Sequence, residues 1–279
     1  MQDRVRIEVD AHGVADVCLV RADKLNALDA AMFAALSAAL ARLKALRGLR
    51  AVVLRGEGRA FCAGLDMASF AAMAGAGGAA DAGVPSDLRL RSHGLANAPQ
   101  HVALGWRELP VPVIAAVHGV AYGGGLQLAL GADLRLLARD ARLSVMEIKW
   151  GLVPDMAGHV LTQGLVRDDV LRELIYSGRV VAADEAVALG LATRVCDDPL
   201  AEARALAQAI SERSPSAVRA AKRLLNRAAH SLGAGAAAML QAESDEQVAL
   251  IGAAHQQEAV RANLERRAPR FDDALTGGS

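Results

Sequence analysis

Two carboxylates eight residues apart are the first candidates for chemistry in this chain of 279 residues. Glu147 and Asp155 both lie in the stretch ARLSVMEIKWGLVPDMAGH, residues 141–159. Glu147 lies in an apolar, strand-like run, where partial loss of water raises the pKa of a carboxylate and suits it to proton transfer. Structural alternatives stay open for both: an edge-strand ion pair of Glu147 with Arg142 or Lys149, and an N-cap role for Asp155 before the next helix.

Two glycine-rich turns are candidates for binding a negatively charged oxygen. RGEGRAFCAGLD (55–66) and HGVAYGGGLQLAL (118–130) each end a strand-like run and open a helix-like one. The first N–H groups of a helix lack partners within it and lie at its positive end. Two such donors that converge would form an oxyanion hole for charge on a carbonyl oxygen. A single glycine turn is more often only a turn, and neither segment completes a dinucleotide-binding or Walker-type pattern.

The charge balance and the cysteines argue against several classes of partner and site. Hydrophobic residues make up 53% of the chain, enough for a large core, and 31 basic residues balance 31 acidic ones. A neutral chain disfavours nucleic acid or an anionic membrane as the main partner. The three cysteines (Cys18, Cys62 and Cys196) are odd in number and widely spaced, which predicts neither disulfides nor a zinc site and favours a reducing, cytoplasmic location.

The elements that must position these residues alternate between strand and helix as far as Cys196, which predicts an α/β fold. The expected strands are 5–9, 14–20, 49–58, 111–119 and 133–138. The expected helices are 30–46, with Asp29 as its N-cap, 87–108 and the one that begins at the glycine triplet. From Leu200 the pattern is helical, so we predict a core of 1–197 and a helical region of 198–279 whose apolar stripes pack on the body or on another subunit.

Six segments together resemble the crotonase superfamily, the enoyl-CoA hydratase/isomerase group, in order and spacing. They are LNALD (25–29), GEGRAFCAGLD (56–66), PVIAAVHGVAYGGGLQLAL (112–130), MEIKWGLVPDMAG (146–158), EAVALGLATRV (185–195) and LERRAPRF (264–271). The resemblance covers nearly the whole chain. It implies a spiral of ββα units followed by a C-terminal helical trimerisation region, with assembly as a homotrimer or a dimer of trimers.

The resemblance also implies an acyl-CoA substrate, whose thioester oxygen would lie between the N–H groups of Leu65 and Gly124. No separate cofactor is expected, because coenzyme A is part of the substrate, and no metal site is expected. The positions that match the family's substrate and CoA contacts are Lys24, Ala63, Gly64, Leu65, Asp66, Met67, Gly123, Gly124 and Gln127. Arg266 or Arg267 would be a phosphate contact, and segment 67–107 would form the pocket wall, with a lid within 71–86.

Gln127 departs from the family's hydratases, which have glutamates at the positions of both Gln127 and Glu147. An amide can hold a water molecule but cannot accept a proton. The family's dienoyl-CoA isomerases have their second acid/base at the position of Asp155. We therefore predict a double-bond isomerase of fatty acid metabolism that uses Glu147 and Asp155. The alternatives are a hydratase with Glu147 alone, in which Gln127 orients water, and an acyl-CoA binding protein without turnover.

Overall fold

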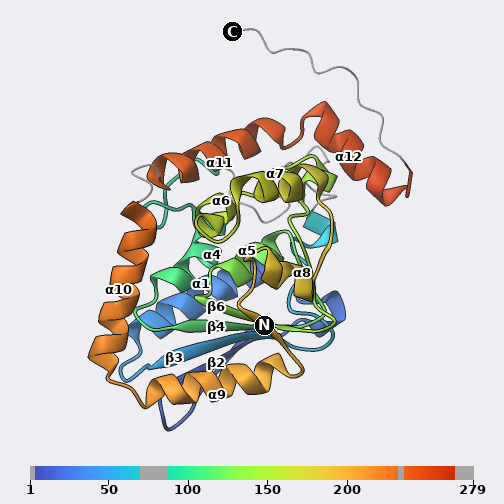
Figure 1. Cartoon of the computed structure of the whole chain (residues 1–279). Coiled ribbons are helices and arrows are strands. Elements are labelled where there is room, and N and C mark those ends of the chain that lie inside the picture. The colour runs from blue at the N-terminus through green and yellow to red at the C-terminus, as the bar shows by residue number, and fades with distance from the viewer. Residues whose placement is uncertain (1–3, 70–86, 232–235, 268–279) are drawn as a thin grey trace.

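A six-stranded sheet lies at the centre of the computed structural model, which describes residues 4–69, 87–231 and 236–267 (Figure 1). Its strand order is β1-β2-β3-β4-β6-β9, with β1 antiparallel to β2 and the other neighbours parallel. The strands are β1 (Val5–Val9), β2 (Val14–Leu19), β3 (Ala51–Gly56), β4 (Val113–Val117), β6 (Leu134–Ala138) and β9 (Arg194–Cys196). The near-continuous apolar runs of β3 and β4 suit parallel strands that are covered on both faces.

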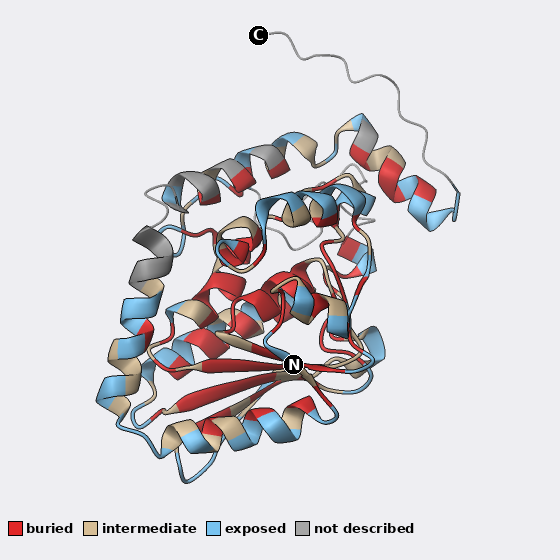
Figure 2. Cartoon of the chain, viewed as in Figure 1, coloured by how far each residue is buried: buried red, intermediate tan, exposed pale blue. Residues whose placement is uncertain are grey.

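Helices cover both faces of this sheet. Val52 and Leu54 of β3 pack in the same cluster as α1 (Ala30–Ala45) and α4 (Ala98–Glu108), whereas Ala51 and Val53 pack with α9 (Pro199–Ser211). Alternate residues of a strand point to opposite faces, so β3 supplies two cores. Figure 2 shows buried residues concentrated in the central strands and the helices above them, with exposed residues along the outer helices.

A smaller sheet and several short helices surround the carboxylates. Its strand order is β5 (Val120–Tyr122), β7 (Arg142–Ser144) and β8 (Val181–Ala182). The helices of this part are α5 (Gly124–Leu130), α6 (Gly158–Thr162), α7 (Asp168–Ser177) and α8 (Ala183–Ala188), with the 3-10 helices η1 (Ala22–Lys24) and η2 (Glu147–Trp150). The sheet fixes the glycine triplet beside the segment of Glu147, because Gly123 donates its N–H to the Ser144 carbonyl at 2.9 Å.

The C-terminal helices pack on the body of the chain. They are α9, α10 (Pro215–Ser231), α11 (Ala236–Leu250) and α12 (Ala254–Leu264), and α11 and α12 run above α6 and α7 in Figure 1. Asn263 of α12 donates to the Lys149 carbonyl of η2 at 2.6 Å. Among the described residues, no helix combines the length and the apolar character needed to cross a membrane.

Most of the sequence predictions for elements are confirmed, and two are wrong. The strands at 5–9 and 14–19 and the Asp29 cap, whose carboxylate accepts from the Met32 N–H at 2.8 Å, are as expected. The helix expected over 87–108 begins only at Ala98, because Asn97 forms a capping box that starts it there. Glu147 is not in a strand: β7 ends at Ser144 and Glu147 opens η2. The lid expected within 71–86 lies outside the described residues.

The ammonium group of Lys222 joins α10 to the core, and its loss is expected to destabilise the fold. It donates to the Val111 carbonyl at 2.8 Å and to the Asp133 carboxylate at 2.7 Å, and it is buried. Lys222→Met leaves these acceptors without their cation, so the free energy of unfolding should fall by about 2–4 kcal/mol. Urea unfolding measures the difference, and Arg223→Met, at an exposed position of the same helix, is the control. Equal midpoints for the two variants would contradict the prediction.

Candidate active site

The two glycine-rich turns lie side by side. Cys62 donates its N–H to the Val120 carbonyl at 3.0 Å and accepts from the Tyr122 N–H at 3.1 Å, so the two segments run in parallel. Gly64 has φ +89°, and a Cβ there would lie 2.6 Å from the Tyr122 carbonyl oxygen and 3.6 Å from the Gly124 nitrogen. Only glycine allows this close approach of two backbones without strain.

The N–H groups of Leu65 and Gly124 are free to donate into the space between the turns. Leu28 binds the residues on either side of Leu65: its N–H donates to the Gly64 carbonyl at 2.7 Å, and its carbonyl accepts from the Asp66 N–H at 3.0 Å. Within the described ranges, neither the Leu65 nor the Gly124 N–H has an acceptor. Both residues line the same cavity. Two free donors on one cavity are what an oxyanion hole requires.

The cavity brings most of the predicted site residues together. It encloses about 660 Å³, its open mouth included, and its wall is mainly apolar. The predicted residues on its wall are Ala63, Gly64, Leu65, Gly123, Gly124, Gln127, Glu147 and Asp155. An apolar cavity with a few convergent polar groups is the usual form of a site for a small molecule or cofactor.

Four predicted contacts lie outside this wall. Lys24 and Met67 are exposed, and Asp66 is buried in an ion pair with Arg21 at 2.7 Å. The Asp66 carboxylate also accepts from the backbone N–H two residues later, which explains its position without a ligand. Arg267 is held by ion pairs with two glutamates. The contacts of these residues with coenzyme A stay predictions.

Glu147 is a buried carboxylate with one unpaired oxygen. Its Oε1 accepts from the Gln127 Nε2 at 2.7 Å, whereas Oε2 has no hydrogen-bond partner among the described residues. Burial raises the pKa of Glu147 to about 7, although the Gln127 hydrogen bond and the charge of His159 act in the opposite direction. A carboxylate with this pKa can exchange a proton near neutral pH, and the free oxygen is the atom available to do so.

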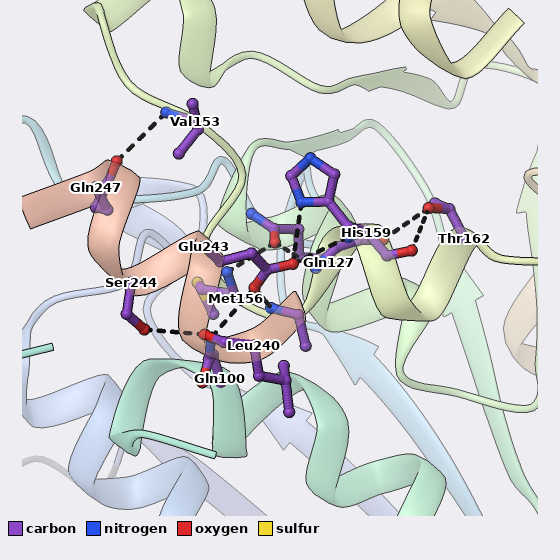
Figure 3. Close-up of polar contacts among 12 residues, drawn as sticks. Gln100, Gln127, Val153, Met156, His159, Thr162, Leu240, Glu243, Ser244 and Gln247 are labelled. Carbon is purple, nitrogen blue, oxygen red and sulfur yellow. Dashed lines mark hydrogen bonds and ion pairs between the residues drawn. The ribbon is translucent and has the colours of Figure 1, made fainter. Parts of the chain in front are cut away.

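The Gln127 amide is held in one orientation by backbone donors. Its Oε1 accepts from the N–H groups of Met156 (Figure 3) and Gly158 at 2.8 and 2.9 Å. Its Nε2 donates to Glu147 at 2.7 Å. Both acceptor positions of the amide oxygen are therefore occupied by the protein. Gln127 thus orients the Glu147 carboxylate and has no spare acceptor for a water molecule.

Asp155 lies on the wall of the same cavity, in the loop before α6. Burial among protein atoms, the Glu243 charge and the Glu147 charge raise the pKa of Asp155 to about 8, in that order of size. A hydrogen bond with Gln247 acts in the opposite direction. The N-cap alternative is excluded, because α6 begins at Gly158 and its N-cap residue is Ala157. The raised pKa favours the protonated form of Asp155, which is the form that can donate a proton.

Sequence reasoning missed the contribution of α11. Gln247 and Ile251 line the cavity, and Glu243 and Ser244 are buried beside them. A sequence signal for this contribution was present: the polar residues 243, 244 and 247 are spaced so that they lie on one face of a helix. Of the segment 67–107, which was expected to form the pocket wall, Pro99 is the described residue that lines the cavity. Other lining residues that the sequence analysis did not single out are Phe33, Tyr122, Met146, Trp150, Leu152 and Met156.

The described residues contain no group of side chains that could hold a metal ion. Cys62, in the first glycine turn, is buried, and burial raises the pKa of its thiol to about 12. Its Sγ donates to the Asn26 carbonyl at 3.1 Å. A thiol held in this form is a poor nucleophile, so it supplies packing and a hydrogen bond beside the site.

Comparisons with known proteins agree with this geometry. The family model described as enoyl-CoA hydratase/isomerase matches residues 10–274. A relative from Thermus thermophilus, provisionally named an enoyl-CoA hydratase, is 34% identical over 95% of this chain and 100% of its own. The mitochondrial methylglutaconyl-CoA hydratase of the mouse is 33% identical over 80% of this chain and 69% of its own. The crystal structure of an enoyl-CoA hydratase/isomerase from Mycobacterium paratuberculosis has a TM-score of 0.80 at 28% identity and covers 94% of this chain and 98% of its own.

Proposed function

Because this chain belongs to the enoyl-CoA hydratase/isomerase family of enzymes, which act on acyl-CoA thioesters, we propose that it shifts a carbon–carbon double bond in an enoyl- or dienoyl-CoA. The observation that carries the proposal is the presence of two carboxylates, the buried Glu147 and the half-buried Asp155, on one cavity wall that has an amide at position 127. The two-glutamate route to hydration needs a carboxylate where this chain has Gln127. A double-bond shift needs only a base and an acid.

The free N–H groups of Leu65 and Gly124 support the first half of such a reaction. Removal of a proton from the carbon next to a thioester carbonyl places negative charge on the carbonyl oxygen. Two backbone donors that need not reorganise stabilise this charge in the transition state more than in the substrate. The apolar wall of the cavity excludes water and strengthens both hydrogen bonds.

The two carboxylates divide the proton transfers between them. Ionised Glu147, through its unpaired Oε2, takes the proton from the carbon next to the thioester, and the electron pair enters the conjugated enolate. Protonated Asp155 then gives its proton to the far end of the enolate, and the double bonds move into conjugation with the thioester. The substrate has lost one proton and gained one. Proton exchange with solvent returns Glu147 to the ionised form and Asp155 to the protonated form.

The pH dependence of kcat/KM is expected to be bell-shaped. Glu147, with its pKa raised to about 7, must be ionised, so the rate rises with pH through that value. Asp155, with its pKa raised to about 8, must be protonated, so the rate falls as pH increases through that value. The two apparent pKa values in the profile belong to the interacting pair of carboxylates and not to either residue alone. Initial rates with a dienoyl-CoA across this range measure both limbs, and a rate that keeps rising above the upper value would exclude Asp155 as the acid.

Hydration by Glu147 alone is the second candidate function, and the names of the relatives favour it. The mouse relative is named a hydratase, as is the one from Thermus thermophilus. In this case Glu147 would activate water, and Asp155 would have no direct part. The binding-only alternative is disfavoured, because the family consists of enzymes and both carboxylates are retained.

Three substrates separate these functions. The protein is incubated with a 2-enoyl-CoA, a 3-enoyl-CoA and a 3,5-dienoyl-CoA, and ultraviolet absorbance is followed. Loss of the conjugated absorbance of the 2-enoyl-CoA indicates water addition, whereas a gain with either of the other two indicates a double-bond shift. Turnover of the 2-enoyl-CoA alone would overturn the isomerase proposal, and no change with all three would leave only binding.

Association of chains as a homotrimer or a dimer of trimers stays a prediction. It is supported by two exposed apolar side chains on α10, Leu224 and Leu225, which are 65% and 71% exposed. Adjacent apolar side chains on a helix surface are typical of an interface with another protein surface.

A further inference from the structure

The loop that carries Asp155 is held by side chains from two other parts of the chain. Figure 3 shows the contacts of Val153, Met156 and His159 with these side chains. Gln127 of α5 accepts from the N–H groups of Met156 and Gly158, and α11 supplies the other acceptors: Gln247 for Val153 at 3.3 Å, and Glu243 for Ala157 and His159 at 3.1 and 3.3 Å. Asp155 therefore lies between α5 on one side and α11 on the other.

Among the described side chains of α11, Glu243 accepts the most hydrogen bonds from this loop. Its side chain is only 1% exposed. Besides the two backbone donors, it accepts from the Gln100 Nε2 at 3.2 Å and from the His159 Nδ1 at 3.0 Å. Burial of a carboxylate is unfavourable in free energy unless the group is hydrogen-bonded and paired, and these four donors offset the loss of water. The position of Glu243 is thus tightly defined.

The loop has no acceptor of its own for these N–H groups. The N-cap residue of α6 is Ala157, which has φ +64° and no side-chain acceptor. A helix end whose first donors are unmatched needs an acceptor from elsewhere. Glu243, about 86 residues later in the chain, supplies it.

Glu243 also acts on Asp155 through its charge. The charged groups that face Asp155 are Glu243 of α11 and Glu147 of η2, and His159 of α6 pairs with Glu243. After burial, the Glu243 charge is the strongest influence that raises the pKa of Asp155. The Glu243 hydrogen bond in turn raises the pKa of His159.

We propose that Glu243 is a positioning residue for Asp155: it fixes the loop of residues 153–159 against the cavity and keeps Asp155 in its protonated form. The proposal rests on the proposed function, in which Asp155 is the proton donor. Glu243 does not line the cavity, so it acts through the loop and not on the substrate.

Two substitutions at Glu243 separate its hydrogen bonds from its charge. Glu243→Gln keeps the size and removes the charge, and its NH2 group would face two N–H donors. We expect kcat for a dienoyl-CoA to fall roughly 10²-fold, because a displacement of about 1 Å can cost this much. KM should change little, and the basic limb of the pH profile should move to lower pH. Glu243→Asp keeps the charge with a shorter reach, so kcat should fall while the basic limb stays.

Asp245→Asn is the matched control on α11. Asp245 is exposed and pairs with Arg89, so its loss of charge should change neither kcat nor the basic limb. The fluorescence of the two tryptophans, Trp106 in the core and Trp150 on the cavity wall, and the unfolding temperature show whether each variant is folded. A kcat and basic limb of Glu243→Gln equal to those of the unchanged protein would overturn the inference and leave the proposed function standing. If the unchanged protein fails to shift the double bond, the proposed function fails, and the inference falls with it.

Discussion

Glu147→Gln is expected to lower kcat for the double-bond shift by roughly 10²–10⁴-fold, the usual contribution of a general base. The substitution keeps the size of the side chain but removes the group that accepts the proton. The loss corresponds to about 2.7–5.5 kcal/mol of activation free energy. KM should change little, because the free Oε2 contributes to proton transfer and the wall of the cavity stays the same. Initial rates with 3-enoyl- and 3,5-dienoyl-CoA measure the effect on both classes of substrate.

A loss of fold would give the same loss of rate, so the stability of this variant is the necessary control. Burial raises the pKa of Glu147 from its ordinary value of 4.5 to about 7, so the stability that the protonated carboxyl contributes is present below pH 4.5 and is lost as the pH rises from there through about 7. Glu147→Gln removes this dependence and should be at least as stable as the unchanged protein at pH values above 7. Glu202→Gln, on the exposed side of α9, is the matched surface variant. A Glu147→Gln protein with full kcat would exclude Glu147 as the base.

Asp155→Asn is expected to have the second large effect, and its size should depend on the substrate. An amide cannot donate a proton to carbon at a useful rate, so turnover of a 3,5-dienoyl-CoA should fall by roughly 10²–10⁴-fold. Hydration of a 2-enoyl-CoA, if the protein performs it, needs only Glu147 and should be much less affected. The ratio of the two rates in the variant, measured by ultraviolet absorbance, therefore reports the role of Asp155 directly.

Asp169→Asn provides the comparison for this variant. Asp169 is exposed at the start of α7 and pairs with Arg167, away from the cavity. Asp169→Asn should leave the rates with the 3,5-dienoyl-CoA and the 2-enoyl-CoA unchanged. If Asp155→Asn also leaves dienoyl-CoA turnover unchanged, the second proton transfer belongs to another group and the two-carboxylate mechanism is wrong.

The burial of Glu147 could be predicted from the sequence, but its local structure could not. Its apolar neighbours correctly predicted burial and a raised pKa. The same neighbours predicted a strand, because a short apolar run does not distinguish a strand from a helical segment. Gly151, with φ +70°, ends η2 directly after this run, and a single glycine does not reveal which element it ends.

The environment of Asp155 was harder to predict, because it depends on residues far away in the chain. The sequence offered an N-cap role, which the start of α6 at Gly158 excludes. The second largest influence on the pKa of Asp155 is Glu243 of α11. The helical pattern of α11 predicted a buried face but not which segment that face would meet. The sequence pattern indicated two glycine turns with free backbone donors, and the family resemblance singled out Leu65 and Gly124 as the expected oxyanion donors. Both residues lie on the wall of the same cavity.

The hydrogen bonds between α11 and the 153–159 loop have a consequence for the order in which parts of the chain fold during synthesis. The side chains that hold Val153 and Ala157 come from residues 94 and 86 positions further along. A ribosome must therefore translate most of the remaining message, and release α11 from its exit tunnel, before the loop can settle. A nascent chain that already has its central sheet would still lack the α11 acceptors for the N–H groups of Val153, Ala157 and His159.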